Sequence, residues 1–162
     1  MQPRVTFEEF GGPGWREMVA LRRSVLRTPL GLDFSNEQLA EEAGQIHIAA
    51  WVDVTLVGTL LLLPPDTAAE GKLRQMAVRP GYQRRGVGQL LVREGVIKLR
   101  CLGAVSARLT ARENALGFYE RIGFLAEGPA FVEVTLPHRL MRKRLDGLRG
   151  NSHDQTSPIA PE

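Results

Sequence analysis

One stretch, 73–91, constrains this 162-residue chain more than any other, because it has the pattern of a strand, a short basic loop and the start of a helix. The loop contains Arg84, Arg85, Gly86 and Gly88. The first N–H groups of a helix lack intrahelical partners, and the helix dipole favours an anion there. Glycines let ligand oxygens approach the backbone, and arginines add positive charge. The stretch therefore predicts an anion site, and the alternative is a glycine-containing turn with two solvated arginines.

Hydrophobic periodicity predicts the elements around this loop. Expected strands cover 4–10, 46–52, 56–63, 72–78, 105–109, 131–134 and 138–143, and expected helices cover 17–26, 36–43, 86–102 and 113–122. This order predicts an α/β (α+β) fold, with a mixed and mostly antiparallel twisted sheet of about seven strands and about four flanking helices. We expect a single domain over 1–146, followed by a polar tail, 147–162, that is mobile because it is rich in Ser, Pro and polar residues.

Composition narrows the classes of function. The longest apolar run, Leu60–Leu63, is far shorter than the ~20 residues of a membrane helix, and the first residues contain no apolar signal core, so we expect a soluble cytoplasmic protein. The net charge of +3 comes without a zinc-finger, helix-turn-helix or aromatic-basic motif, so no nucleic-acid partner is expected. A single cysteine, Cys101, excludes an internal disulfide and a multi-cysteine metal site. We expect it to be a buried packing residue of its helix.

The loop also carries a family signature. Gln83-x-x-Gly86-x-Gly88 matches the Gln/Arg-x-x-Gly-x-Gly/Ala motif of the GNAT superfamily of N-acetyltransferases, and the flanking segments 76–78 and 89–91 resemble that family as well. The resemblance covers most of 16–144. It implies the GNAT fold and transfer of an acetyl group from acetyl-CoA to a primary amine of a small molecule or peptide, by direct attack in a ternary complex and without a metal.

A second motif follows about thirty residues later. Ala115-x-x-Phe118-Tyr119 with Gly123-Phe124 is similar to the family's Ala-x-x-(Leu/Phe)-Tyr-x-x-x-Gly-Phe segment. By this resemblance Tyr119 is the general acid that protonates the leaving thiolate. A phenol with a pKa of about 10 can do so, because a thiol has a pKa of about 8.5. The alternative for Tyr119 is a structural role, packing its helix against the sheet.

The resemblance also assigns contacts to the acyl donor. Backbone groups of Met76 and Val78 would meet the pantetheine and thioester, and the Val78 N–H would stabilise the oxyanion. Many members carry an asparagine where this chain has Arg112, which could instead reach a phosphate or remain solvated. The residues expected around the bound coenzyme are Met76, Val78, Gln83, Arg84, Arg85, Gly86, Val87, Gly88, Gln89, Arg112 and Phe118.

An alkylamine has a pKa near 10.4, so the acceptor needs a base or a water chain to take its proton. The candidates are Glu133, His138 and His47, each with a structural role as the alternative. Glu133 and His138 flank a predicted turn at 135–137 and are expected to face one another. The Pro137-His138-x-x-Met141 segment and the stretch 21–31 resemble one subgroup of the GNAT family.

Two other functions are also compatible with the sequence. The chain could be a non-catalytic acyl-CoA-binding module, or an unrelated nucleotide binder that uses the same loop. Arg22, Arg23 and Arg27 are expected on the polar side of the first helix, as a solvated face or as a site for an acidic substrate. The sequence leaves open whether the chain forms a homodimer, and it does not identify the acceptor.

Overall fold

The computed structural model describes residues 2–146, and the expectation of a mobile tail over 147–162 lies outside them. A seven-stranded sheet has the order β1-β2-β3-β4-β5-β7-β6, and all neighbours are antiparallel except β4 and β5. The strands are β1 (Arg4–Glu8), β2 (Ile46–Val52), β3 (Thr55–Leu63), β4 (Glu70–Val78), β5 (Ser106–Arg112), β6 (Leu125–Glu133) and β7 (Leu136–Arg144). The predicted mixed, mostly antiparallel sheet is confirmed.

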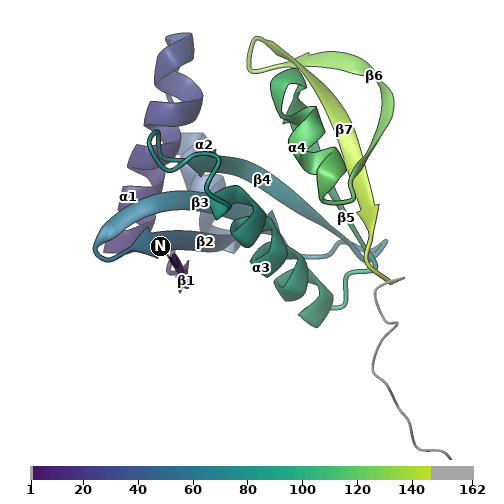
Figure 1. The fold of residues 1–162 in the computed structure, drawn as a ribbon, viewed down its shortest axis with the longest axis horizontal. Helices are drawn as coiled ribbons and strands as arrows, with labels where there is room; N and C mark the ends of the chain where they lie inside the picture. The colour runs from purple at the N-terminus through teal and green to yellow at the C-terminus, as the bar shows by residue number, and fades with distance from the viewer. Residues whose placement is uncertain (1, 147–162) are drawn as a thin grey trace, which may run out of the picture.

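Helices cover both faces of this sheet (Figure 1). Successive residues of β2 show the two faces, because Ile48 and Ala50 pack in the larger core beneath α3, whereas Ala49 packs with Met18 of α1. α4 contacts β5 and β6. The α-helices are α1 (Pro13–Arg22), α2 (Asn36–Ala40), α3 (Val87–Cys101) and α4 (Leu116–Arg121), with a π-helical turn at Arg23–Arg27 and 3-10 turns at Thr28–Leu30, Glu41–Gly44 and Glu113–Ala115.

The sheet divides between β4 and β5. Their parallel pairing consists of three residue pairs, Glu70↔Ser106, Gly71↔Ala107 and Lys72↔Arg108, and the strands then separate (Figure 1). β5 continues in register with β7 along its whole length. The second half of β4 is therefore paired with β3 alone, and its other edge borders a gap in the sheet.

A bulge interrupts β4 beside this gap. Thr59 pairs with Ala77 and Leu61 pairs with Arg74, so two steps along β3 correspond to three along β4. The extra length is taken up at Gln75, whose φ of 51° is left-handed. Bulges of this kind bend a strand and redirect its side chains. Here the bulge turns the last residues of β4 relative to the first.

Several local expectations need correction. Cys101 is exposed at the end of α3, because only the face of this helix that meets the sheet is buried. The turn between the last strands lies at Val134 and Thr135, with φ values of 49° and 64°, so Leu136 and Pro137 belong to β7. A two-residue hairpin loop with two positive φ angles suits the twist of the strands it joins. Within residues 2–146, no helix is both long and apolar enough to cross a membrane.

Candidate functional site

The predicted anion loop connects β4 to α3. Gly81, Arg84 and Gly86 have left-handed φ angles of 92°, 59° and 82°, which curl the chain so that Gly86 caps α3. The first helical N–H with a partner at this end is that of Leu90, which donates to the Gly86 carbonyl at 3.0 Å. The N–H groups of 87–89 precede it and have no intrahelical carbonyl to bind. A side chain at Gly86 would meet nothing within 4 Å, so the helix end is open to a ligand.

The edge of β4 lies next to this loop. The Arg79 N–H donates to the Val57 carbonyl at 2.8 Å, toward β3. Backbone groups of alternate residues point to opposite sides of a strand, so those of Val78 and Met76 point into the gap. The Gln83 side chain donates to the Val78 carbonyl at 3.1 Å and fixes the loop against the strand end. The Val78 N–H therefore faces the gap where the resemblance expects a thioester.

Three of the predicted coenzyme residues meet where β4, α3 and α4 converge. A Cβ added to Gly88 would lie 3.2 Å from the Phe118 ring and 3.3 Å from the Met76 methyl group. Gly88 is buried, whereas Arg84 and Arg85 are exposed. The structure thus brings the two sequence motifs together at the α3 end of the gap, with exposed arginines outside and close packing inside.

Tyr119 lies in α4 with its ring edge-on to Phe118 and Phe124, at centroid distances of 4.9 Å and 5.9 Å. The side chain is 8% exposed, and this burial raises the pKa of its phenol. Burial disfavours the phenolate, so the group keeps its proton at any ordinary pH. The arrangement fits both a proton donor and a packing residue.

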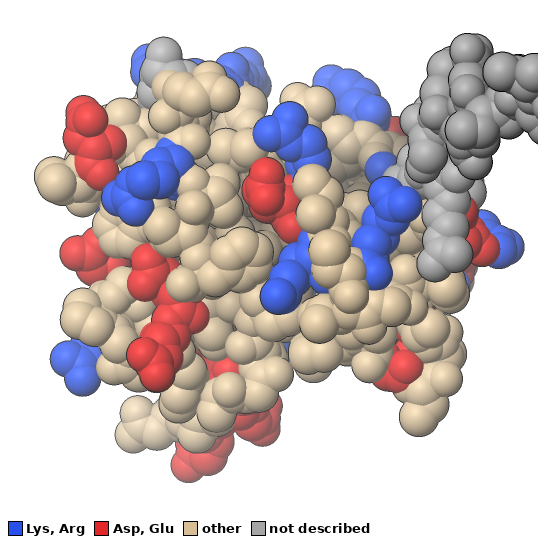
Figure 2. All heavy atoms as spheres, turned by 90° about the horizontal axis from the view of Figure 1, so that it is seen from below, with Lys and Arg blue, Asp and Glu red and all other residues tan. Residues whose placement is uncertain are grey.

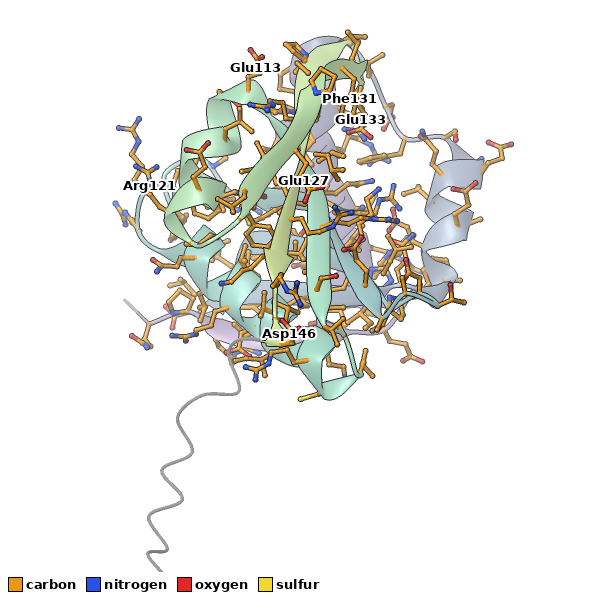
Figure 3. All side chains as sticks on the ribbon, turned by 90° about the vertical axis from the view of Figure 1, so that its right-hand side faces the viewer. Glu113, Arg121, Glu127, Phe131, Glu133 and Asp146 are labelled. Atoms are coloured by element: carbon orange, nitrogen blue, oxygen red, sulfur yellow. The ribbon has the colours of Figure 1, made fainter. Side chains whose placement is uncertain are left out.

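Glu133 and His138 face one another at the end of the β6–β7 hairpin, as predicted. His138 Nδ1 lies 2.8 Å from the Leu136 carbonyl, which can only accept, so Nδ1 carries the proton. In the neutral ring Nε2 then bears the lone pair, 3.7 Å from Glu133 Oε2. That oxygen also accepts the Thr110 hydroxyl at 2.7 Å. Figure 3 shows Glu133 near the top of this hairpin, with Glu113 and Arg121 on the α4 side.

Arg112 and His47 occupy other environments. Arg112 Nη2 donates to the Leu26 carbonyl at 3.0 Å, which engages it with the π-helical turn after α1. A contact of Arg112 with the coenzyme stays a prediction. His47 belongs to β2, two strands from β4, and its Nε2 lies 3.0 Å from the Glu42 carbonyl. Burial lowers the pKa of His47. The structure brings Glu133 and His138 together and leaves His47 apart from them.

The expectation of a solvated Arg22 is wrong. Its side chain is fully buried, forms hydrogen bonds of 2.7 and 2.9 Å to the Glu42 carboxylate, and donates to the Gln75 side chain at 2.6 Å. The sequence contained a signal for this burial, because Arg22 lies four residues after the apolar Met18. Residues four apart lie on the same face of a helix. Arg23 pairs with an exposed Asp33 at 2.6 Å. Arg22 therefore links α1 to the bulge of β4.

Figure 2 shows a face with charges of both signs, on which acidic groups are more frequent at the left and basic groups more frequent at the top and right. The Arg27 guanidinium lies 4.6 Å from the centre of the Phe34 ring, and other cations lie near it. Burial, followed by the charges of Arg112 and Arg22, lowers the pKa of Arg27. Glu133 acts on Arg27 in the opposite direction, so Arg27 interacts with charges of both signs.

Comparison with known proteins gives a consistent result. The family model of the Acetyltransferase (GNAT) family matches residues 15–124, more than half of the chain. The segment includes the anion loop, the gap-facing half of β4, β5 and Tyr119. It ends just before β6, so the match does not include Glu133 or His138.

The chain is also similar to individual proteins and solved structures. Bacillus subtilis YyaT, named an uncharacterized protein, is 30% identical over 76 residues, 46% of this chain and half of its own length. The crystal structure of an acyl-CoA N-acyltransferase from Pseudomonas aeruginosa has a TM-score of 0.72, with 20% identity over 88% of this chain and 99% of that one. A Bacillus subtilis acetyltransferase in complex with CoA has a TM-score of 0.69, with 18% identity over 88% of this chain and 99% of that one.

Proposed function

The chain belongs to the acetyltransferase (GNAT) family, and from this premise we propose that it transfers an acetyl group from acetyl-CoA to a primary amine. The observation that carries the proposal is the gap between β4 and β5, which begins after three residue pairs and lies beside the open N-terminus of α3. One end offers free N–H groups to a pyrophosphate, and the strand edge offers N–H groups to an acyl oxygen. A similar fold in a structure complexed with CoA supports this use of the gap.

The residues fit the coenzyme at two places. The open space at Gly86 would admit phosphate oxygens, and the N–H groups of 87–89 have no intrahelical acceptor and can donate to them. Bound there, acetyl-CoA supplies an activated thioester carbonyl and a thiolate leaving group. The Val78 N–H is directed into the gap, where it would donate a hydrogen bond to the developing oxyanion.

The proton transfers complete the proposed mechanism. The amine nitrogen forms a bond to the carbonyl carbon while the carbon–sulfur bond breaks. Tyr119 holds a proton on its phenol and gives it to the departing sulfur. His138 Nε2, beside Glu133, is the atom that takes the proton the amine must lose, either directly or through water. The transfer takes place in one ternary complex of enzyme, donor and acceptor.

The test is turnover of Tyr119→Phe in a screen of amines that follows release of free CoA. We expect kcat to fall by about 10²–10⁴-fold, the usual contribution of a general acid, with acetyl-CoA affinity unchanged by calorimetry. A loss below about threefold would contradict the role of Tyr119. Tight acetyl-CoA binding without turnover of any amine would favour a non-catalytic acyl-CoA-binding module instead.

Three further proposals accompany this function. We propose that residues 1–146 form the single functional domain, since the strands of the described residues, 2–146, form one sheet. We propose that the protein works in the cytoplasm, because its proposed donor, acetyl-CoA, is an intracellular metabolite. The acceptor is proposed to be a small molecule or a peptide rather than a nucleic acid. Light scattering of the purified protein would show whether it assembles as a homodimer.

A further inference from the structure

A group of cations lies on the face of the sheet opposite α3, where the β4–β5 pairing ends. Gly71 approaches Leu99 of α3, and Leu73 packs in the same core, so Lys72 and Arg74 point to the other face. On β5, Ala107 and Leu109 pack in that core, so Arg108 also points away from it. Lys72 and Arg108 are paired across the two strands.

These side chains line a surface cavity of about 250 Å³. Its wall consists of Leu63, Pro64, Asp66, Glu70, Lys72, Arg74 and Arg108. The space is at the small end of ligand pockets, which run from about 300 Å³ upward for drug-sized molecules. It suits a ligand of amino-acid size or the charged end of a longer one.

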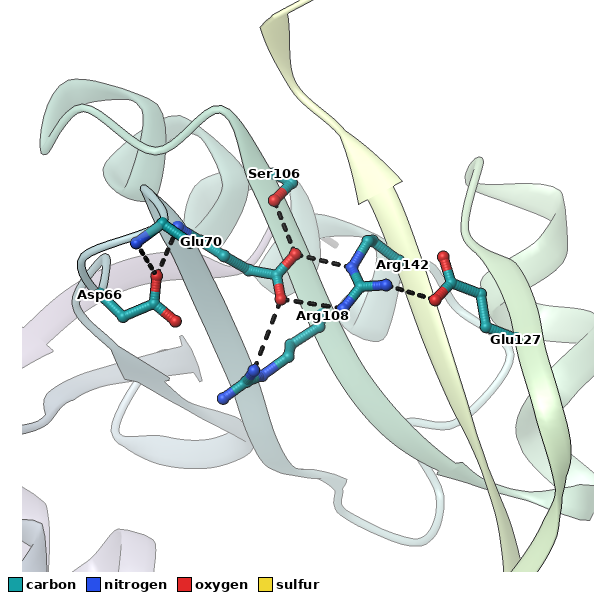
Figure 4. Close-up of polar contacts among 7 residues, drawn as sticks. Asp66, Glu70, Ser106, Arg108, Glu127 and Arg142 are labelled. Atoms are coloured by element: carbon teal, nitrogen blue, oxygen red, sulfur yellow. Dashed lines mark hydrogen bonds and ion pairs between the residues drawn. The ribbon is translucent and has the colours of Figure 1, made fainter.

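The carboxylates of this cavity already have partners (Figure 4). Glu70 accepts from Ser106 at 2.7 Å and from Arg142 at 2.7 and 3.1 Å, and it lies 3.5 Å from Arg108. These contacts, above all the one from Arg142, lower the pKa of Glu70. Asp66 accepts the Ala68 and Glu70 N–H groups at 2.9 and 3.0 Å.

Lys72 and Arg74 are left without such a partner. Within residues 2–146, neither forms an ion pair or a side-chain hydrogen bond. Both residues are half-buried. Burial and then repulsion by the charge of Arg74 lower the pKa of Lys72, and the charge of Glu133 opposes this only in part. An anion in the cavity would relieve this repulsion and bind two free cations.

We propose that the cavity holds the anionic group, a carboxylate or a phosphate, of the amine that is acetylated, and this inference rests on the proposed function. Arg74, the cation of the cavity nearer to the gap, lies four residues before Val78, roughly 13 Å along the strand. An anion bound at Lys72 and Arg74 would place an amine carried about that far away, or less, next to the bulge and the gap. The acceptor is then an acidic amine, such as an amino acid or a phosphorylated amine.

The experiment compares acceptors that differ only at the end remote from the amine. The probes are 6-aminohexanoate, 6-aminohexyl phosphate, n-hexylamine and the six-carbon diamine, each assayed by CoA release with saturating acetyl-CoA. We expect one of the anionic amines to exceed n-hexylamine in kcat/KM by at least about tenfold, since a hydrogen-bonded charge pair contributes on that order. The carboxylate and phosphate arms identify which anion is preferred.

Variants assign this preference to the cavity. Lys72→Gln and Arg74→Gln should each raise KM for the preferred anionic amine about tenfold, change n-hexylamine little, and leave KM for acetyl-CoA unchanged. Arg93→Gln on the exposed side of α3 removes a cation from the opposite face and is the matched control. Equal turnover of neutral and anionic amines, or faster turnover of the diamine, overturns the inference while leaving acetyl transfer intact.

A binding measurement covers the case in which none of these amines is turned over. N-acetyl-6-aminohexanoate, the product of the carboxylate probe, is titrated by calorimetry into protein saturated with CoA, beside N-hexylacetamide. Tighter binding of the charged product, lost in Lys72→Gln, supports the cavity even without turnover. The inference is overturned if the two products bind with equal affinity and the N-acetyl derivative of 6-aminohexyl phosphate binds no more tightly. Failure of acetyl-CoA itself to bind would instead contradict the proposed function.

Discussion

Arg22 and Glu42 form an ion pair that is closed to solvent, with side-chain exposures of 0% and 3%. Removing two charges from water is costly, and only close geometry with further hydrogen bonds compensates for it. Trp15 also donates to Glu42 and Arg22 also donates to Gln75, so within residues 2–146 only Arg22 Nε of the buried guanidinium lacks a hydrogen-bond partner. The ion pair thereby joins α1, the segment before β2, and the bulge of β4.

We predict that Glu42→Ala lowers the free energy of unfolding by about 3–5 kcal/mol, because it leaves the Arg22 charge buried and unpaired. The double variant Arg22→Met, Glu42→Leu should lose less than Glu42→Ala alone, since neither charge remains. Urea unfolding measures both. If the double variant is the less stable of the two, the burial of charge is not what makes Glu42→Ala costly.

His47 should make stability depend on pH. Its pKa is lowered from 6.5 by burial, so the unfolded chain binds a proton that the folded chain does not. The free energy of unfolding therefore falls as pH drops below about 6.5, at most by about 1.4 kcal/mol per pH unit from this group. His47→Gln should show a smaller loss between about pH 7.5 and 5.5 by thermal unfolding. Parallel pH dependences of the two proteins would refute this assignment.

At the residue level, the sequence predicts what is local and misses what depends on the third dimension. The open start of α3 was predictable, because glycines and arginines before a helix carry the relevant geometry within one segment, whereas anion binding there stays a prediction. The link from Arg22 to Gln75 spans 53 positions and crosses from a helix to a strand. The open cavity at Lys72 could not be predicted either, because strand alternation does not reveal which face remains uncovered.

The closeness of α3 to the sheet is an element-scale property that depends on glycine. A Cβ added to Gly58 of β3 would lie 2.8 Å from side-chain atoms of both Val87 and Leu91. Val87 is the first residue of α3. The missing side chain therefore sets how closely the start of α3, where the anion site is predicted, approaches the sheet.

We predict that Gly58→Ala lowers the free energy of unfolding by roughly 1–3 kcal/mol through overpacking and also weakens acetyl-CoA binding by displacing the start of α3. Gly44→Ala, where a Cβ would meet nothing within 4 Å, is the matched control and should change neither property. Calorimetry gives the affinity and urea unfolding the stability. A destabilised Gly58→Ala that binds acetyl-CoA as tightly as the parent would separate the start of α3 from the coenzyme site.

Element boundaries show where periodicity alone is insufficient. β6 begins at Leu125, six residues before the strand expected from the apolar pattern at 131–134. Apart from the half-buried Ala126, its added part is exposed, so burial produces no alternating pattern there. Its pairing with β7 shifts register between Glu127 and Phe131. Gly128 has a φ of 71° within this irregularity. Cross-strand hydrogen bonds to β7, rather than burial, determine the extent of β6.

On the scale of the whole molecule, the sheet consists of two parts, β1–β4 and β5–β7, which share three residue pairs and the helix α3 that connects them in the chain. Side-chain hydrogen bonds also cross this junction. Arg142 of β7 reaches Glu70 of β4, and Glu70 binds Ser106 of β5. A ligand that fills the gap would contact both parts, so its binding should be visible as a change in stability of the entire fold.

We predict that acetyl-CoA at about 100 times its Kd stabilises the fold by about 2.7 kcal/mol, which for a chain of this size raises Tm by roughly 5–10 °C. In hydrogen exchange, protection should increase at the gap-facing N–H groups of Met76 and Val78 and at residues 87–89, which have no carbonyl partner in the helix. Strands β1 and β2 report the gain in protection that comes from global stabilisation alone, and the gap-facing groups should gain more than these strands do. ATP is the control ligand, because its phosphates could occupy the anion loop but it carries no pantetheine to lie along β4. Protection confined to 87–89, and equal for ATP and acetyl-CoA, would mean that the loop binds phosphates without delivering a thioester to the strand, and the acetyltransferase mechanism would then give way to nucleotide binding.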